Sequence, residues 1–330
     1  MSDVSKIAID GITINIKDAS ARNSIEIIDK KVTEFGNSTL VNVVTDIPTQ
    51  TKDDNIYNVI NSDESLSYNM PVSYHDNLLK ANNKFATELK QNKLTVGVFN
   101  IDNENTPYRL GLKGVKKLTK LQNIFNKLGC GILGLNEVLQ SDWYSVNEFL
   151  TTEFLPYYYY SVNTKNLVPN MNVGNAILSH IQPQITSGAI FSNKYGAERQ
   201  GYCKCVYTFN GKVISVYCTH LCYNNDTTLK NQIEELYNVV SNDTSPYKII
   251  MGDFNFDLTN SASYLSSFLN VGYKLTNGGK YKTYNDSRNI GVDEIMVSSN
   301  ITIASSGVGN AEFIEHLSDH FPLWSTLIFN

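Results

Sequence analysis

From residue 94 onward, short apolar runs typical of buried strands alternate with stretches whose apolar residues recur at helical spacing. The pattern predicts helices over residues 114–129, 142–154, 227–240 and 261–269. It predicts strands over residues 94–100, 130–138, 157–163, 174–180, 203–209, 212–220, 247–255, 292–299, 301–306 and 321–329. Interleaved helices and hairpins favour an α/β domain built on mixed sheets.

The first 40 residues follow a different pattern. Residues 7–16 are two alternating apolar runs joined by Asp10-Gly11, which predicts a hairpin with a type I′ turn, and residues 17–35 then show helical spacing. A unit this small buries too little apolar surface to be stable alone. We therefore expect residues 1–40 to dock on a partner or on copies of themselves.

The next segment is mostly polar. Residues 45–75 are weakly periodic, and a short helical stretch over residues 77–91 leads into the main domain. The predicted organisation is an appendage over 1–40, a linker over 41–93 and a catalytic domain over 94–330.

The composition is that of an ordinary soluble globular protein, with 42% apolar and 18% charged residues. No apolar run is long enough to span a bilayer, and the start lacks the basic and apolar regions of a Sec signal peptide. We therefore expect a soluble protein without membrane insertion. A net charge of −5 gives no sign of bulk attraction to nucleic acid, but a bound metal ion can supply local positive charge to a nuclease.

Several predicted strands share one feature, which is an apolar run bounded by an acid, an amide or a histidine. These residues are Asn100, Glu137, His220, Asp253, Asn255, Asp293, Asp319 and His320. Each has an ordinary explanation: Asp253 and Asn255 could cap a turn, Glu137 could lie on the surface, and His320 could be a loop histidine. So many such strand ends in one domain favour a site, because catalytic groups gather at strand ends in α/β folds.

The residue types match one kind of chemistry. Asn100, Glu137 and Asp319 offer hard oxygen ligands suited to Mg²⁺. Two histidines with a separate carboxylate suit general acid–base catalysis, in which the carboxylate fixes the tautomer of one imidazole. No serine or cysteine has a local nucleophile motif such as G-x-S-x-G. Metal-assisted attack of water on phosphorus requires this set of groups.

Residues 94–330 resemble the endonuclease/exonuclease/phosphatase family, which has the DNase I-like fold. The matching segments occur in family order: "VFN" (Asn100), "LNE" (Glu137), "GNAILS" (174–179), "THL" (His220), "GDFN" (Asp253, Asn255), "VDEIMVS" (Asp293) and "SDHFP" (Asp319, His320). "GDFN" alone is a weak match, but the ordered set is specific. The resemblance implies a four-layer α/β/β/α sandwich for these residues, and the hairpin and helix predicted over residues 1–40 form a small appendage to it.

The resemblance also implies a metal site and a proton-transfer pair. Glu137, with Asn100 and Asp319, resembles the main Mg²⁺ site of the family, for which Mn²⁺ and Ca²⁺ are alternatives. Asp293 resembles the carboxylate that orients His320, and His320 resembles the proton-transfer group that faces the scissile phosphate.

Other residues match groups that contact the water or the substrate. Asp253 and Asn255 resemble the pair that positions the attacking water and the phosphate or a second metal. His220 resembles the second histidine of the DNase I and sphingomyelinase branches. Asn175 and Arg199 are expected to contact phosphate oxygens.

Three positions depart from the family pattern. Phe99 stands where tryptophan is common, Asn136 replaces the usual glutamine, and Glu294 occupies a position that is often aromatic. None of these changes removes a catalytic residue type. They bear on the choice of substrate.

The substrate is expected to be a phosphodiester, with DNA favoured. The "THL" segment argues against the abasic-site-endonuclease branch and leaves DNase-like nucleases, sphingomyelinase-like phosphodiesterases and inositol-phosphate phosphatases open. A phospholipid headgroup, teichoic acid and a non-catalytic structural role are further alternatives. Metal titration separates the structural role from catalysis.

The N-terminal segment indicates where the protein is located. Residues 7–25 resemble a short segment near the N-termini of many bacteriophage tail proteins. This resemblance implies a virion component that is anchored to the tail through residues 1–40, with homo-oligomerisation as an alternative way to bury the helix face. Otherwise we expect a cytoplasmic protein.

The stretch "VISVYCTHLC" (213–222) places His220 between two cysteines. Asn210-Gly211 as a two-residue turn puts Cys203 opposite Cys218, and strand alternation puts both, with Cys205 and His220, on one face. Packed thiols, a Cys203–Cys218 disulfide and a zinc site are therefore all open. Packed thiols are favoured because the same face carries apolar residues and free cysteine is often buried.

Overall fold

The computed structural model describes residues 6–9, 12–15, 56–60, 67–102, 115–141, 158–168, 171–195, 200–285 and 290–330. Residues 1–57 and residues 58–330 form two separate compact units. The larger unit contains two six-stranded sheets, here named sheet I and sheet II.

Sheet I mixes parallel and antiparallel strands. Its strands β11 and β12 run parallel, while the pairs β10–β11 and β12–β14 are antiparallel. Its order is β13 (Lys274–Leu275), β14 (Asp293–Val297), β12 (Tyr247–Asp253), β11 (Lys212–His220), β10 (Gly201–Phe209) and β9 (Ile185–Ile190).

Sheet II has a similar plan. Its strands β5 and β6 run parallel, and β16 is antiparallel to β5. Its order is β15 (Ile301–Val308), β16 (Leu323–Phe329), β5 (Lys93–Asn100), β6 (Ile132–Ser141), β8 (Met171–Ser179) and β7 (Tyr158–Val168).

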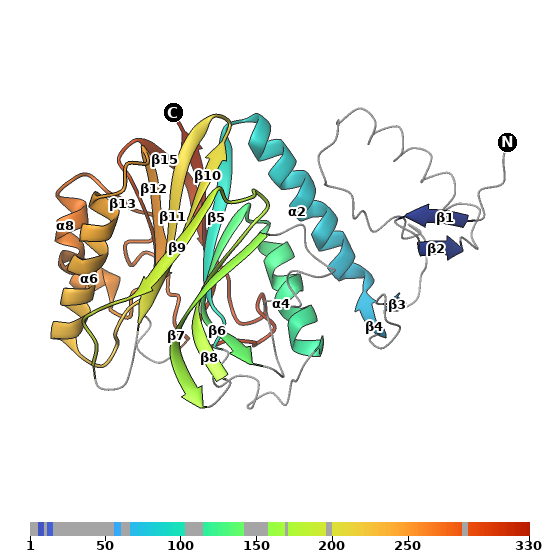
Figure 1. Cartoon of the computed structure of the whole chain (residues 1–330), viewed down its shortest axis with the longest axis horizontal. Helices are drawn as coiled ribbons and strands as arrows, with labels where there is room; N and C mark the ends of the chain where they lie inside the picture. The colour runs from blue at the N-terminus through green and yellow to red at the C-terminus, as the bar shows by residue number, and fades with distance from the viewer. Residues whose placement is uncertain are drawn as a thin grey trace. The chain divides into compact units, whose positions relative to one another are not determined.

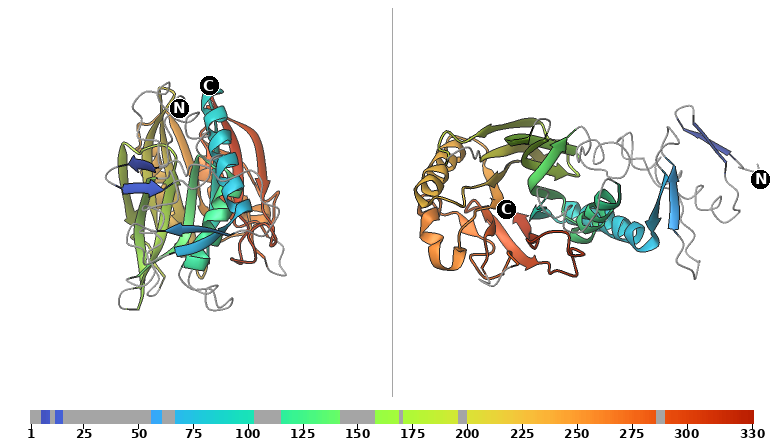
Figure 2. Two further views of the ribbon diagram at one scale, coloured as in Figure 1. Left: turned by 90° about the vertical axis from the view of Figure 1, so that its right-hand side faces the viewer. Right: turned by 90° about the horizontal axis from the view of Figure 1, so that it is seen from below.

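The helices cover the outer faces of the two sheets, as Figures 1 and 2 show. Helices α6 and α8 lie on sheet I, and helices α2 and α4 lie on sheet II. Their bounds are α2 (Val72–Lys90), α4 (Val115–Leu128), α6 (Asp226–Ser241), α7 (Leu258–Ser261) and α8 (Ser266–Leu269), with a 3₁₀ turn, η1 (Ala262–Leu265), between α7 and α8.

Three hydrophobic cores separate these four layers. The core between the sheets includes Val96 and Val98 of sheet II and Val216 of sheet I, all fully buried. A second core lies under α4 and includes Phe125, and a third lies under α6 and α8 and includes Phe268. The predicted four-layer α/β/β/α sandwich is confirmed.

Several local predictions differ from the structure. The helix expected over 261–269 is divided into α7, η1 and α8. Strand β9, "ITSGAI", was not expected, because all six residues are exposed and show no apolar alternation. The helices expected over 17–35 and 142–154 lie outside the described residues.

The N-terminal hairpin is present in the smaller unit. Strand β1 (Lys6–Ile9) pairs antiparallel with β2 (Ile12–Asn15), with Ile9 opposite Ile12. This register confirms the predicted pairing. The docking role of residues 1–40 and their phage-tail resemblance stay predictions.

The segment expected to be a linker contains regular structure. Strands β3 (Ile56–Ile60) and β4 (Ser67–Pro71) form a two-stranded sheet, and the predicted helix is α2. Glu88 of α2 is buried and accepts hydrogen bonds from Thr95 N at 2.7 Å and from Thr95 Oγ1. This contact ties α2 to the start of β5. The proposed domain boundaries stay a prediction.

All five cysteines are buried and free. Cys203 lies directly opposite Cys218, and both lie in the core between the sheets with Cys205. Burial raises the pKa of the Cys203 thiol well above its usual range. The prediction of packed thiols is confirmed. None of the described helices combines the length and the apolar character needed to cross a membrane.

Candidate functional site

The predicted residues of sheet I lie in one row across three neighbouring strands. His220 ends β11 and pairs in register with Asp253, which ends β12. Asp253 in turn pairs with Asp293, the first residue of β14. Because β14 is antiparallel to β12, the first residue of β14 lies beside the last residues of β11 and β12, at the same end of the strands.

Sheet II contributes residues at the same end of the sandwich. Asn100 ends β5 and pairs with Asn136 of the parallel strand β6. A β-bulge between Leu135 and Val138 interrupts β6, and Glu137 within it has φ 56°. A bulge changes the direction of a side chain, and this one places Glu137 beside Asn100.

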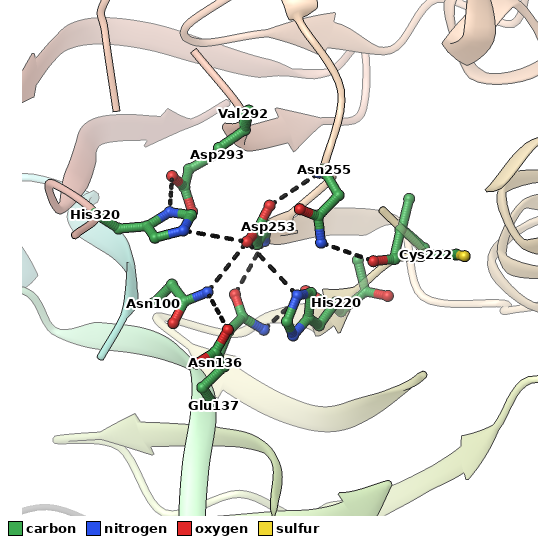
Figure 3. Close-up of polar contacts among 12 residues, drawn as sticks. Asn100, Asn136, Glu137, His220, Cys222, Asp253, Asn255, Val292, Asp293 and His320 are labelled. Atoms are coloured by element: carbon green, nitrogen blue, oxygen red, sulfur yellow. Dashed lines mark hydrogen bonds and ion pairs between the residues drawn. The ribbon is translucent and has the colours of Figure 1, made fainter. Parts of the chain in front are cut away.

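Asp253 is the centre of the cluster, as Figure 3 shows. Its Oδ2 atom lies 3.1 Å from Asn100 Nδ2 and 3.6 Å from Nε2 of both His220 and His320. Its Oδ1 atom accepts a hydrogen bond from Asn255 N at 2.8 Å. Asp253 therefore joins the two histidines to the sheet II residues.

Asn255 holds the turn that follows Asp253. Its backbone has φ 58°, a left-handed conformation that asparagine tolerates better than most residues. Its side-chain amide donates to Leu221 O at 2.8 Å, one residue beyond His220. Asn255 thus connects the ends of β11 and β12.

His320 and Asp293 form a buried pair. Asp293 Oδ2 lies 3.0 Å from His320 Nδ1. Burial alone would lower the pKa of His320, but the negative charges of Asp293 and Asp253 outweigh it and raise that pKa to about 10. Burial raises the pKa of Asp293 to about 6, against the opposing effect of His320. At neutral pH the pair is therefore an ion pair.

The segment that carries His320 is fixed to strand β5. Ser318 Oγ accepts a hydrogen bond from His320 N at 3.0 Å and donates to Asn100 O at 2.7 Å. The ring of Tyr284 packs on the imidazole, with 4.9 Å between the ring centroids. These contacts hold the imidazole against Asp253.

Asn100 links two carboxylates of the site. Its Nδ2 atom lies 3.1 Å from Glu137 Oε1 and 3.1 Å from Asp253 Oδ2, while its Oδ1 atom accepts from Asp102 N at 3.0 Å. The side chain therefore presents N–H groups, not its oxygen, to the carboxylates. Its predicted role as a metal ligand stays a prediction and would require the opposite amide orientation.

A pair of buried amides forms the floor beneath the site. Asn136 Nδ2 donates to Asn175 Oδ1 and to Thr219 O, both at 2.8 Å, and Asn136 Oδ1 accepts from Asp253 N at 2.9 Å. Asn175 Nδ2 donates to Gly201 O at 2.8 Å. Because Asn136 and Asn175 lie on sheet II and their other partners on sheet I, the amides join the two sheets.

The remaining predicted residues occupy different positions. Asp319 is 30% exposed, and its Oδ1 lies 4.0 Å from His320 Nε2. Both polar ends of the buried Asn175 bond to protein atoms, so it supports the floor, and its predicted contact with phosphate stays a prediction. Arg199 lies outside the described residues.

The sequence did not reveal the residues that hold the predicted catalytic side chains in position. Asn136 departs from the family pattern and Ser318 lies inside "SDHFP", but the sequence alone gives neither residue a role. Thr283 and Tyr284 had no motif around them. Polar residues adjacent to motif residues were the one available signal.

The donor groups fit a divalent cation. Ligand atoms of Asp253, Asp293 and His320 lie within 4.8 Å of one another. Asp293 Oδ1 is also buried without a hydrogen-bond partner among the described residues. An unsatisfied carboxylate oxygen beside other carboxylates is typical of a site for a hard cation such as Mg²⁺. Glu137 and Asp253 both accept from Asn100 Nδ2, and the predicted roles of Glu137 and Asp319 as metal ligands stay predictions.

Comparisons with known proteins identify the family. A model of the Endonuclease/Exonuclease/phosphatase family matches residues 97–320. No match is found among curated proteins.

Solved structures share the fold at low sequence identity. A family protein from Leptotrichia buccalis is 18% identical with a TM-score of 0.58, and the alignment covers 70% of this chain and 98% of that one. The mannosyl-6-phosphatase Bt3783 of Bacteroides thetaiotaomicron is 15% identical (TM-score 0.56; 72% and 100% covered). D. rerio TDP2 complexed with a single-strand DNA product is 14% identical (TM-score 0.57; 71% and 98% covered). These structures share the fold, and the family match over residues 97–320 shows that this chain belongs to the endonuclease/exonuclease/phosphatase family, whose members are phosphoester hydrolases.

Proposed function

We propose that the protein is a metal-dependent phosphodiesterase that hydrolyses DNA. The observation that carries the proposal is the row of His220, Asp253 and Asp293, together with His320 bonded to Asp293. Two imidazoles that both approach one carboxylate provide proton transfer on two sides of a reacting phosphate. The fold shared with TDP2, which was solved with a DNA product, supports DNA as the substrate.

Asp253 and Asn255 position the attacking water in this proposal. Asp253 Oδ2 lies 3.6 Å from Nε2 of both His220 and His320. A water molecule bound to Asp253 Oδ2 is therefore close to both imidazoles. Asn255 keeps the Asp253 carboxylate oriented through its backbone N–H. Such positioning accounts for a large part of the rate in phosphoryl transfer.

His320 moves the proton at its Nε2 atom. Asp293 accepts the Nδ1–H of the imidazolium and leaves its Nε2–H facing Asp253, so His320 donates the Nε2 proton to the leaving oxygen. His220 is then placed for the other proton transfer, from the attacking water. In this proposal Glu137 and Asp253 would hold a divalent ion, which would neutralise the charge that develops on the phosphoryl oxygens.

A panel of phosphoesters tests the proposal. Supercoiled plasmid, RNA, nucleotides, sphingomyelin and teichoic acid are each incubated with Mg²⁺ and with EDTA, using wild-type protein and His320→Ala. We expect Mg²⁺-dependent nicking of plasmid that the variant loses by about 10²–10⁴-fold. If DNA stays intact while headgroup or phosphate is released from another substrate, the DNA proposal is wrong and the non-nucleic alternative holds. If every substrate stays intact, the protein is not this enzyme.

A further inference from the structure

Glu294 is a fully buried carboxylate, and both of its oxygens accept hydrogen bonds from backbone N–H groups. Its Oε1 atom accepts from Thr276 N at 3.0 Å, Asn277 N at 2.9 Å and Ile295 N at 2.8 Å. Its Oε2 atom accepts from Gly278 N at 2.7 Å. A buried carboxylate needs such partners, and here a single side chain organises the start of a turn.

Glu294 and Asp293 point to opposite faces of sheet I. Along β14, Ile295 packs in the core between the sheets and Met296 in the core under the helices. Strand alternation therefore places Asp293 on the inner face and Glu294 on the outer face. Neighbouring carboxylates on one strand thus have separate partners, one in the site and one in the turn.

The turn held by Glu294 has an unusual backbone. Gly278 and Gly279 follow each other with φ of 54° and 78°. A Cβ atom at Gly279 would lie 2.3 Å from Thr259 Oγ1 and 2.6 Å from Thr259 N. The glycines permit the turn, but its N–H groups need an acceptor inside the protein, and Glu294 provides it.

Asn277 connects the turn to the site through hydrogen bonds of its side chain. Its Oδ1 atom accepts from Tyr281 N at 2.7 Å, and its Nδ2 atom donates to Asp293 O at 3.1 Å. The turn is therefore bonded to the backbone of the residue whose side chain holds His320.

The same segment then contacts the Asp293–His320 pair directly. Thr283 Oγ1 accepts from Val292 N at 2.9 Å and from Asp293 N at 3.0 Å. Thr283 O accepts from Phe321 N at 2.7 Å. Residues on both sides of the pair, next to Asp293 and next to His320, are thus fixed to one threonine.

We propose that Glu294 is a positioning residue for hydrolysis: it folds residues 275–285 so that Thr283 and Tyr284 hold Asp293 and His320 together. The proposal rests on the proposed function for its effect on catalysis, but its structural part stands alone. A carboxylate is needed because it accepts at both oxygens, whereas glutamine would present an amino group to an N–H donor.

The test compares Glu294→Gln with Glu88→Gln in the full-length protein. Glu88 is a matched control because it is also buried and accepts from a backbone N–H, but it ties α2 to the start of β5, away from the strand ends that carry the site. Amide hydrogen exchange is measured residue by residue by NMR. Hydrolysis of bis-p-nitrophenyl phosphate with Mg²⁺ gives kcat and KM.

In Glu294→Gln we expect exchange at the N–H groups of Gly278, Val292, Asp293 and Phe321 to accelerate by about tenfold or more. We expect kcat to fall by about 10²-fold with little change in KM, because the displacement affects the reacting groups. Glu88→Gln should leave these four amides and kcat unchanged.

Faster exchange at Gly278 alone, with unchanged kcat, would overturn the proposal. If Glu294→Gln does not fold, the isosteric variant Thr283→Val tests the proposal instead. It removes the hydroxyl that accepts from Val292 N and Asp293 N, so it breaks the connection between the turn and the Asp293–His320 pair. Unchanged exchange at Asp293 and unchanged kcat in that variant would also overturn it. If the wild type hydrolyses no phosphoester, the proposed function fails, while the exchange comparison still tests the positioning role.

Discussion

The two halves of the site contain similar residue types held in different ways. On sheet I, Asp253 and Asp293 both approach the imidazole of His320, so positive charge lies between two carboxylates. On sheet II, Glu137 is joined to Asp253 through the neutral amide of Asn100. The first arrangement suits proton transfer, and the second keeps negative charge available for a cation. Mutations that separate these two functions test the distinction.

The largest effect is expected from Asp293→Asn. The amide keeps the size of the side chain but removes the negative charge that stabilises the His320 imidazolium, so kcat should fall by about 10³–10⁴-fold. Binding of Mn²⁺, followed by calorimetry, should be little changed. A large loss of metal affinity would instead make Asp293 a ligand and would remove the proposed division between the halves.

Glu137→Gln should show the reverse pattern. Removing one carboxylate from the sheet II half should raise the Kd for Mn²⁺ by roughly 10²-fold, because amide oxygen is a weaker ligand for a hard cation. Activity should recover in part at high Mg²⁺, which Asp293→Asn should not show. Equal metal affinity in wild type and variant would contradict the assignment of Glu137.

Asn136→Ala should weaken both halves together, since Asn136 joins the sheets beneath them. The variant leaves buried partners such as Asp253 N without an acceptor, and we expect a loss of roughly 2–3 kcal/mol in the free energy of unfolding. Urea unfolding measures it. A loss below about 0.5 kcal/mol would mean that water replaces the amide without cost.

The pH dependence of stability should be smaller and specific to the sheet I half. The pKa of His320 is raised from 6.5 to about 10, so the stabilisation by its charge is complete below pH 6.5 and is lost as pH rises through about 10. In EDTA, wild type should lose on the order of 2 kcal/mol between these limits relative to His320→Gln. Parallel pH profiles of the two proteins would contradict the ion pair.

The strand ends were the part of the site that the sequence predicted best. An apolar run ends at His220 and another at Asp253, and a third begins at Asp293. Because β11 and β12 are parallel and β14 is antiparallel to β12, these three residues lie side by side at one end of the strands. The α/β class with mixed sheets followed from the alternation of strands and helices, and the order of the four layers followed from the family resemblance.

Other features depend on contacts between the sheets, which local patterns do not encode. The left-handed backbone of Glu137 arises from a bulge, and the partners of Asn136 come from the opposite sheet. Glu294 is one residue from a catalytic motif, yet only the turn at 276–278 shows why a carboxylate is buried there. Strand β9 could not be predicted, since its exposed residues lack a periodic signal.

The central claim is that this site hydrolyses DNA with a divalent ion and His320. Its most direct test is conversion of supercoiled plasmid to nicked circles by purified wild-type protein and His320→Ala in Mg²⁺, with an EDTA control. We predict nicking by the wild type that EDTA abolishes and that the variant loses by about 10²–10⁴-fold. Equal nicking by both proteins, or none by the wild type, would contradict the claim.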